Sequence, residues 1–178
     1  MQNNSKKILN VSSFDTNLGK MIAAVDEHFL YLLEFENCKN LDNKFNKLKK
    51  KYDISFETTE NQVVSNLRQE LINYFNGSLV EFKTPIKFIG SVFQKKVWDA
   101  LLCIPFGDTF SYRDIANSIK NTNAFRAVAN ANAMNSLAII VPCHRVVRAN
   151  SNLGGYAGGI EKKQFLINHE KSIKNKVT

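Results

Sequence analysis

The sequence predicts an α/β N-terminal domain followed by a mainly α-helical C-terminal domain with a helix-turn-helix. Three observations support this. Residues 12–36 alternate between apolar and polar residues, as strands do. The pattern changes to helical periods after Pro85. Two short helical segments joined by a polar turn then follow, in a chain with a net charge of +8. We therefore expect two domains, at residues 1–84 and 85–178.

The N-terminal half contains turn residues that divide it into elements. The alternating stretch is broken at residues 17–19 and 26–28, which predicts two or three strands. A charged, amphipathic helix is expected from about Leu41 to Tyr52. A second helix is expected in VVSNLRQELINYFNG, whose apolar residues recur at helical spacing and which ends at Gly77.

The C-terminal half reads as successive helices. SVFQKKVWDALLCIPFG has one apolar face and stops at Pro105 and Gly107. In FSYRDIANSI, Ser111 and Asp114 fit the cap of a helix start, where the helix dipole also favours the acid. The turn KNTN leads into a second short helix, AFRAVANANAMN.

Composition and charge limit the kind of protein. No apolar run approaches the roughly 20 residues of a membrane span, and the first ten residues do not resemble a secretory signal. Three cysteines are too few for a disulfide framework, so we expect a cytoplasmic protein without a membrane partner. Its Cys and His residues lack metal-site spacing, so no metal is expected.

The positive charge admits two interpretations. An excess of Lys and Arg suggests a polyanionic partner or an anionic membrane surface, whereas the alternative is a solvated, lysine-rich surface. We assign the lysines of LDNKFNKLKKKYD mainly to such a solvated helix face.

The second short helix does not resemble a major-groove reader. Arg126 is its only cation, and its other residues include Ala127, Ala129 and Asn130. Small side chains let a helix approach a narrow surface, which suits the minor groove and predicts low sequence preference. The alternative is an internal helix whose alanines pack against other helices.

A possible nucleophile lies in LAIIVPCHRVVRAN, where Cys143 precedes His144. A base beside a thiol, oriented by a third group, raises the thiolate fraction, either directly or through a water. Glu170 shares the apolar face of the last helix with Leu166, where a carboxylate must be hydrogen-bonded. The alternatives are a buried structural cysteine, a surface glutamate, and His169 as the rival partner of His144.

Together these stretches resemble the O6-alkylguanine-DNA alkyltransferase family (methylated-DNA–protein-cysteine methyltransferases), and most closely its bacterial Ogt-type and Ada C-terminal-half members. About half of the chain carries the resemblance strongly, and PCHRV in this order is highly specific. The resemblance implies a ribonuclease-H-like N-terminal domain, with a small antiparallel sheet plus helices. It also implies irreversible, single-turnover transfer of an alkyl group from guanine O6 to Cys143, after base flipping in double-stranded DNA. The expected protein is a monomer without a metal or nucleotide cofactor. The resemblance leaves activity on O4-alkylthymine open.

The resemblance also assigns roles to individual residues. Cys143 is the alkyl acceptor, His144 and Glu170 activate it through a water, and Asn135 braces the turn that holds it. Tyr112 supports the guanine leaving group, and Arg126 fills the gap left by the flipped base. The remaining expected contacts are to DNA, by Ser111, Lys120, Ala127, Ala129 and Asn130, and to the flipped base, by Val146, Tyr156 and Ala157.

The chain departs from the family pattern at several positions. Lys120 and Thr122 replace a Gly and a Pro of the turn before the second helix, which predicts a less rigid turn and an added phosphate contact from Lys120. Ala157 leaves only its backbone N–H for guanine O6. Asn130 is larger than expected, and Ala138 replaces a proline, which predicts a more yielding pocket wall.

Three other functions fit parts of this pattern. A non-catalytic damage sensor of the same fold would lack the cysteine. A Cys-His-Glu hydrolase would turn over repeatedly and would need an oxyanion hole. A transcriptional regulator would bind one sequence through the major groove.

Overall fold

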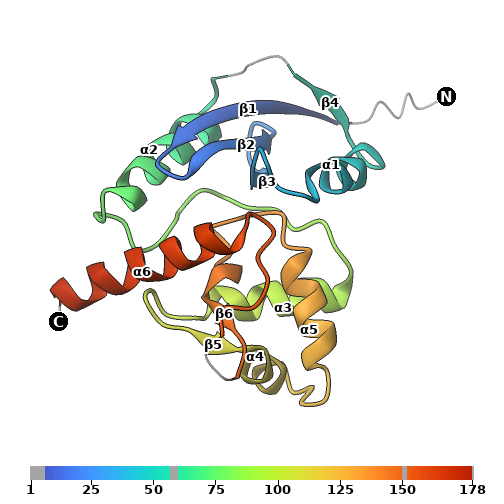
Figure 1. Cartoon of the computed structure of the whole chain (residues 1–178). Coiled ribbons are helices and arrows are strands. Elements are labelled where there is room, and N and C mark those ends of the chain that lie inside the picture. Colours follow the sequence, from blue (N-terminus) through green and yellow to red (C-terminus); the bar gives the residue numbers. More distant parts are fainter. Residues whose placement is uncertain (1–6, 57–59, 150–151, 178) are drawn as a thin grey trace.

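The structure is a computed structural model that describes residues 7–56, 60–149 and 152–177. The first six residues, which bear on the expectation about a secretory signal, lie outside these ranges. Figure 1 shows the sheet and its flanking helices in the upper layer and a group of helices in the lower layer.

The sheet contains the three predicted strands and one more. Strands β1 (Ile8–Thr16), β2 (Gly19–Val25) and β3 (Leu30–Phe35) pair in antiparallel order. Strand β4 (Asp53–Ser55) pairs with β1 in parallel, giving the order β3-β2-β1-β4. The expected antiparallel pairing is therefore confirmed for β1, β2 and β3, and β4 makes the sheet mixed. A strand of three residues is too short to show the alternation from which strands are predicted.

Two helices pack on opposite faces of this sheet. Helix α1 (Leu41–Lys49) ends before Tyr52 because the chain turns into β4. Its buried Leu48 packs with one set of strand residues, including Leu9 and Leu32. Helix α2 (Gln62–Phe75) packs its apolar face on the other set, which includes Phe14 and Leu33. Alternation along the strands thus supplies two cores.

The C-terminal half is mainly helical, as predicted. Its longer elements are α3 (Val92–Leu102), α4 (Tyr112–Ser118), α5 (Phe125–Ala133) and α6 (Ile160–Val177). A single 3₁₀ turn covers Cys143–Arg145, and the short strands β5 (Phe110–Ser111) and β6 (Val146–Val147) pair in parallel. Reciprocal capping boxes start α3, at Ser91 and Gln94, and α4, at Ser111 and Asp114.

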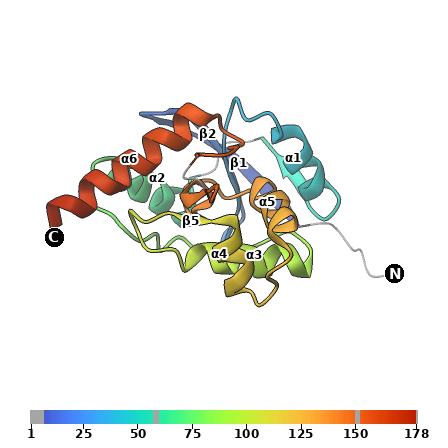
Figure 2. The same ribbon diagram turned by 60° about the horizontal axis from the view of Figure 1, so that its bottom comes forward.

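The edge of β3 joins the two halves. Leu30 exchanges backbone hydrogen bonds with Pro85 and Lys87, and Leu33 does so with Ser136 and Ala138, each at 2.8 Å. Buried residues of both halves form one hydrophobic cluster. Figure 2 shows α6 running across the molecule beside α2. The division into domains at residue 84 stays a prediction.

The helix-turn-helix is formed by α4 and α5, which pack against each other and against α3. The turn between them contains Lys120 with φ of +57°, a left-handed conformation that favours glycine. Among the residues that the structure describes, no helix is long and apolar enough to cross a membrane. The same residues include no cluster of three or more possible metal ligands.

Candidate active site

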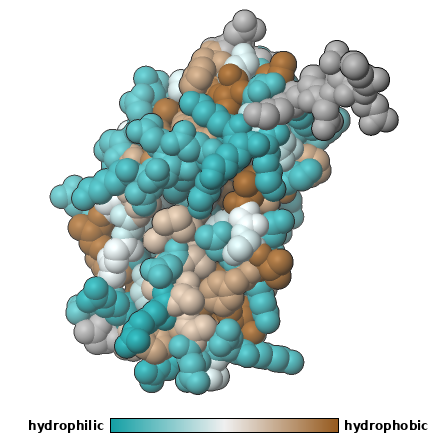
Figure 3. Space-filling model, turned by 90° about the vertical axis from the view of Figure 1, so that its right-hand side faces the viewer, coloured by the Kyte–Doolittle hydropathy of each residue, from teal (hydrophilic) through white to brown (hydrophobic). Residues whose placement is uncertain are grey.

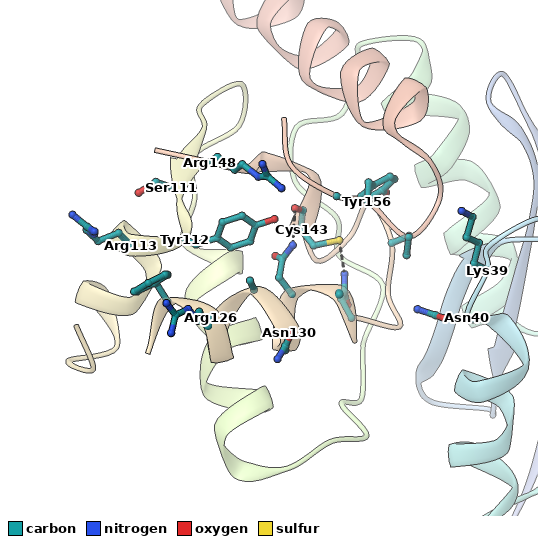
Figure 4. Close-up of a pocket in the computed structure, with 18 of the residues that line it drawn as sticks. Lys39, Asn40, Ser111, Tyr112, Arg113, Arg126, Asn130, Cys143, Arg148 and Tyr156 are labelled. Atoms are coloured by element: carbon teal, nitrogen blue, oxygen red, sulfur yellow. Dashed lines mark hydrogen bonds between the residues drawn. The ribbon is translucent and has the colours of Figure 1, made fainter. Parts of the chain in front are cut away.

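A pocket of about 770 Å³ opens between α4, α5, the segment after β6 and the N-terminal half. Figure 4 shows Cys143 in its interior, with Tyr112 and Arg126 on one side and Lys39 and Asn40 on the other. Of the expected site residues, the pocket is lined by Ser111, Tyr112, Arg126, Ala129, Asn130, Asn135, Cys143, Tyr156 and Ala157.

Cys143 begins the 3₁₀ turn that follows the buried run 137–142. Only 6% of the residue is exposed, yet it lines the pocket, so a molecule in the pocket can reach the sulfur. Asn135 donates from Nδ2 to Cys143 Sγ over 3.1 Å and to the Val141 carbonyl over 3.0 Å. Burial raises the pKa of Cys143, and the Asn135 hydrogen bond opposes this effect by stabilising the thiolate.

His144 follows the cysteine in the 3₁₀ turn and is fully buried. Its Nε2 lies 2.7 Å from Oε1 of Glu170, which is itself only 1% exposed. Among the described residues, His144 Nδ1 has no hydrogen-bond partner. Burial lowers the pKa of His144 against the opposing effect of Glu170, so the ring is neutral and can accept a proton.

Glu170 is held by donors from several distant segments. Arg145 donates to it from Nε over 2.8 Å and from Nη2 over 3.1 Å. The Tyr74 hydroxyl donates over 2.8 Å, and the Gly107 backbone N–H donates over 3.2 Å. Burial alone would raise the pKa of Glu170, but its bonds to His144 and Arg145 outweigh burial and keep the carboxylate ionised.

The rival assignment of His169 as the partner of His144 is not supported by the geometry. His169 Nε2 instead lies 2.8 Å from the backbone oxygen of Tyr74. The apolar face of α6 thus directs Glu170 to His144, as the sequence pattern indicated. No sequence pattern indicates the contacts of Tyr74 and Gly107 with Glu170, because both residues lie more than 60 positions from it.

Tyr112 is half-buried at the start of α4, and in Figure 4 its hydroxyl is directed toward Cys143. Gly154 has φ of +67°, and a Cβ atom there would lie 3.2 Å from the Tyr112 hydroxyl, so glycine leaves space for the tyrosine. Burial and the nearby Cys143 charge raise the pKa of Tyr112, so the hydroxyl keeps its proton.

Lys163 on α6 fixes the segment that carries Tyr156 and Ala157. The lysine is buried and donates from Nζ to the Val146 carbonyl over 2.5 Å and to the Gly155 carbonyl over 3.3 Å. Burial lowers its pKa to about 8. Val146 is buried and does not line the pocket, so its contact with a flipped base stays a prediction.

Helix α5 has one buried and one exposed face. Val128 and Ala131 pack inward, whereas Arg126, Ala127 and Asn130 are exposed, so the helix is not an internal one. Ala127 and the exposed Lys120 lie outside the pocket lining, and their DNA contacts stay predictions. The pocket rim adds cations that sequence reasoning missed, namely Lys39, Arg113 and Arg148.

The α5 side of the molecule mixes these polar groups with small apolar ones. Figure 3 views the molecule from the side on which α1 and α5 lie, and pale brown and white atoms there are interspersed with hydrophilic residues. The pocket lining itself combines cations, such as Arg126 and Arg148, with small residues, such as Ala129 and Ala157.

Comparison with known families gives two matches that together span most of the chain. Residues 10–88 match the ribonuclease-like domain of 6-O-methylguanine DNA methyltransferase. Residues 92–172 match the DNA-binding domain of the same family.

Individual relatives agree with these matches. The methylated-DNA–protein-cysteine methyltransferase of Methanosarcina acetivorans is 40% identical over 160 residues, which cover 89% of this chain and 96% of that protein. The constitutive enzyme of Bacillus subtilis is 40% identical over 161 residues, covering 88% and 92%. The crystal structure of Mycobacterium tuberculosis OGT in complex with DNA has a TM-score of 0.79 at 35% identity, covering 92% of this chain and 94% of that one. The chain therefore belongs to the methylated-DNA–protein-cysteine methyltransferase family.

Proposed function

We propose that this protein repairs double-stranded DNA by moving an alkyl group from O6 of guanine to its own Cys143. The observation that carries the proposal is the position of Cys143. Its sulfur lines a pocket beside the exposed face of α5, and the next residue, His144, is paired with the buried Glu170. The family match supports it, because curated relatives are named for this transfer.

In the proposed reaction His144 removes the thiol proton. Its Nδ1 is the nitrogen left without a described partner, and a water between Nδ1 and Sγ would carry the proton. The ionised Glu170 holds the opposite nitrogen and stabilises the imidazolium that forms.

The sulfur then forms a bond to the alkyl carbon while the bond from that carbon to guanine O6 breaks. The electron pair of the broken bond stays on guanine, which takes up a proton as it leaves. Tyr112 is the proposed donor to the leaving base, because its hydroxyl is protonated and faces the sulfur. The proton that His144 took from the thiol balances the one that guanine gains, so Tyr112 ends the reaction protonated. The N–H of Ala157 is the proposed donor to O6.

The lesion must leave the duplex to reach the sulfur, at a cost of a few kcal/mol. We propose that α5 enters the minor groove with its small residues and that Arg126 fills the vacated stack. Ser111, Ala127, Ala129, Asn130 and Lys120 are the proposed contacts to the surrounding DNA. Tyr156 and Ala157 close over the flipped base together with Val146, and Asn135 braces the cysteine turn.

A thioether is a very poor leaving group, so each protein molecule reacts once. We further propose that the protein acts as a monomer, in the cytoplasm, and without a metal or nucleotide cofactor.

The test is the stoichiometry of the reaction with duplex DNA that carries O6-methylguanine. Repaired guanine should plateau at one per protein molecule, and the Cys143 peptide should gain the mass of one methylene group. Cys143→Ser should abolish transfer but retain DNA binding. Product that continues to accumulate beyond one equivalent would show a hydrolase-like turnover and overturn the proposal.

A further inference from the structure

The N-terminal half of the chain reaches Cys143 through a short series of contacts. Strand β3 holds the segment after Asn135 by the two backbone hydrogen bonds between Leu33 and residues 136 and 138. This segment leads directly into the cysteine turn. The N-terminal half is therefore attached to the part of the chain that positions the nucleophile.

A buried ion pair adds a second attachment at the same place. Glu34 on β3 and Lys44 on α1 form a salt bridge, and they are only 2% and 3% exposed. Lys44 Nζ also donates to the backbone oxygen of Asn135 over 2.5 Å. The second Glu34 oxygen accepts from the Phe35 N–H over 3.1 Å. Burying two charges is costly, and these hydrogen bonds offset part of the cost.

Asn135 connects this ion pair to the sulfur. Its carbonyl accepts from Lys44, its Oδ1 accepts from the Leu137 N–H over 2.9 Å, and its Nδ2 donates to Cys143 Sγ. The residue is thus fixed on its backbone by the N-terminal half and on its side chain by the cysteine turn. Figure 4 marks the bond to the sulfur by a dashed line.

We propose that the Glu34–Lys44 ion pair is a positioning element of the active site, which holds the Asn135 amide against the sulfur of Cys143. By this inference the N-terminal domain takes part in setting the reactivity of the nucleophile. The inference rests on the proposed role of Cys143 as the alkyl acceptor.

The charges of the pair also act on the thiol directly. Burial raises the pKa of Cys143, Glu34 raises it further, and Lys44 lowers it. Other titratable or charged groups also face or adjoin the sulfur, and they lie on the cysteine turn, α4, α6 and the loops. These groups are His144, Arg145, Tyr112, Lys163, Glu170, Arg148, Tyr156 and Cys38. Replacing Glu34 or Lys44 leaves all these side chains in place, although the pair also acts on the pKa of Cys38, and Glu34 acts on that of Tyr156.

Replacing the two members of the pair should therefore move the pH profile in opposite directions. Glu34→Gln leaves the Lys44 charge and its bond to Asn135, so the thiolate should form at lower pH. Lys44→Met leaves the Glu34 charge and loosens Asn135, so the thiolate should form at higher pH. We expect shifts of about half a unit or more, which correspond to about threefold or more in the thiolate fraction.

The experiment measures the rate at which iodoacetamide alkylates Cys143 between pH 6 and 10, read from the mass of the Cys143 peptide so that Cys38 and Cys103 do not interfere. Single-turnover methyl transfer from duplex DNA is followed over the same range. Lys47→Met is the matched control, because Lys47 lies on the same helix and contacts Met134 rather than Asn135. Its profile should match that of the unaltered protein.

If the pair has a purely structural role, both variants should lose stability, but the midpoints of their pH profiles should not move in opposite directions. Superimposed pH profiles of Cys143 alkylation would overturn the inference. The double variant Glu34→Gln/Lys44→Met should have a midpoint above that of Glu34→Gln, and it decides the question if Lys44→Met does not fold. If the unaltered protein fails to methylate Cys143 from DNA, the proposed function is wrong; opposite shifts with iodoacetamide would still support the positioning role.

Discussion

Arg126 occupies the exposed side of α5 at the edge of the pocket that contains Cys143. If it fills the vacated base stack, Arg126→Ala should slow repair in duplex DNA about ten- to a hundredfold, because each 1.4 kcal/mol of uncompensated unstacking is about tenfold in rate. The reaction with free O6-methylguanine needs no flipping and should change little. Single-turnover rates on both substrates provide the measurement.

A matched control for this substitution is Arg68→Ala, which removes one arginine from α2, outside the site pocket. It should leave both rates nearly unchanged. Equal slowing of the two reactions by Arg126→Ala would contradict the assigned role. A loss in duplex that low salt restores would instead indicate a simple phosphate contact.

Single residues also show how far the site could be predicted from sequence. Glu170 was predictable because a carboxylate on the apolar face of α6 must be bonded. Arg145 and Tyr74, which hold that carboxylate, were not assigned. Tyr74 comes from α2 in the other half of the chain, and Arg145 adjoins His144 without any pattern that specifies burial. Contacts of this kind depend on the tertiary fold.

At the scale of elements, the turn between α4 and α5 contains a residue in an unfavourable conformation. Lys120 has φ of +57°, which costs a residue with a side chain about 1–2 kcal/mol, whereas glycine adopts it freely. Lys120→Gly should raise the free energy of unfolding by about 0.5–1 kcal/mol, since the greater freedom of glycine in the unfolded chain offsets part of the gain. The midpoint temperature of thermal unfolding should rise by about 1–3 °C.

Thr122→Gly provides the comparison in the same turn, because Thr122 is not among the described non-glycine residues with positive φ. That change should lower stability or leave it unchanged. A Lys120→Gly protein that melts below the unaltered protein would show that the lysine side chain makes a contact worth more than the backbone strain.

Helices were predictable where the apolar spacing is long, as in α2, α3 and α6. The short strands β4, β5 and β6 were not expected, because two or three residues carry no period. The parallel pairing of β5 with β6 brings the start of α4 beside the end of the cysteine turn. The approach of Tyr112 to Cys143 thus depends on a contact that the sequence does not indicate.

At the scale of the whole molecule, the net charge of +8 and the cations around the pocket mouth favour binding to phosphates. Each phosphate neutralised by Lys or Arg releases counterions, so the logarithm of the binding constant falls by about 0.9 per contact for each tenfold rise in salt. If the pocket-rim cations Lys39, Arg113 and Arg148 and the exposed Lys120 each contact one phosphate, raising salt from 50 to 200 mM should weaken duplex binding about a hundredfold. The minor groove offers little sequence information, so undamaged duplexes of different sequence should bind about equally. Fluorescence anisotropy titrations of several duplexes, with Cys143→Ser to prevent reaction, measure both properties. An affinity that is insensitive to salt, or one duplex bound far more tightly than the rest, would mean that the charged rim does not contact the phosphate backbone in this way.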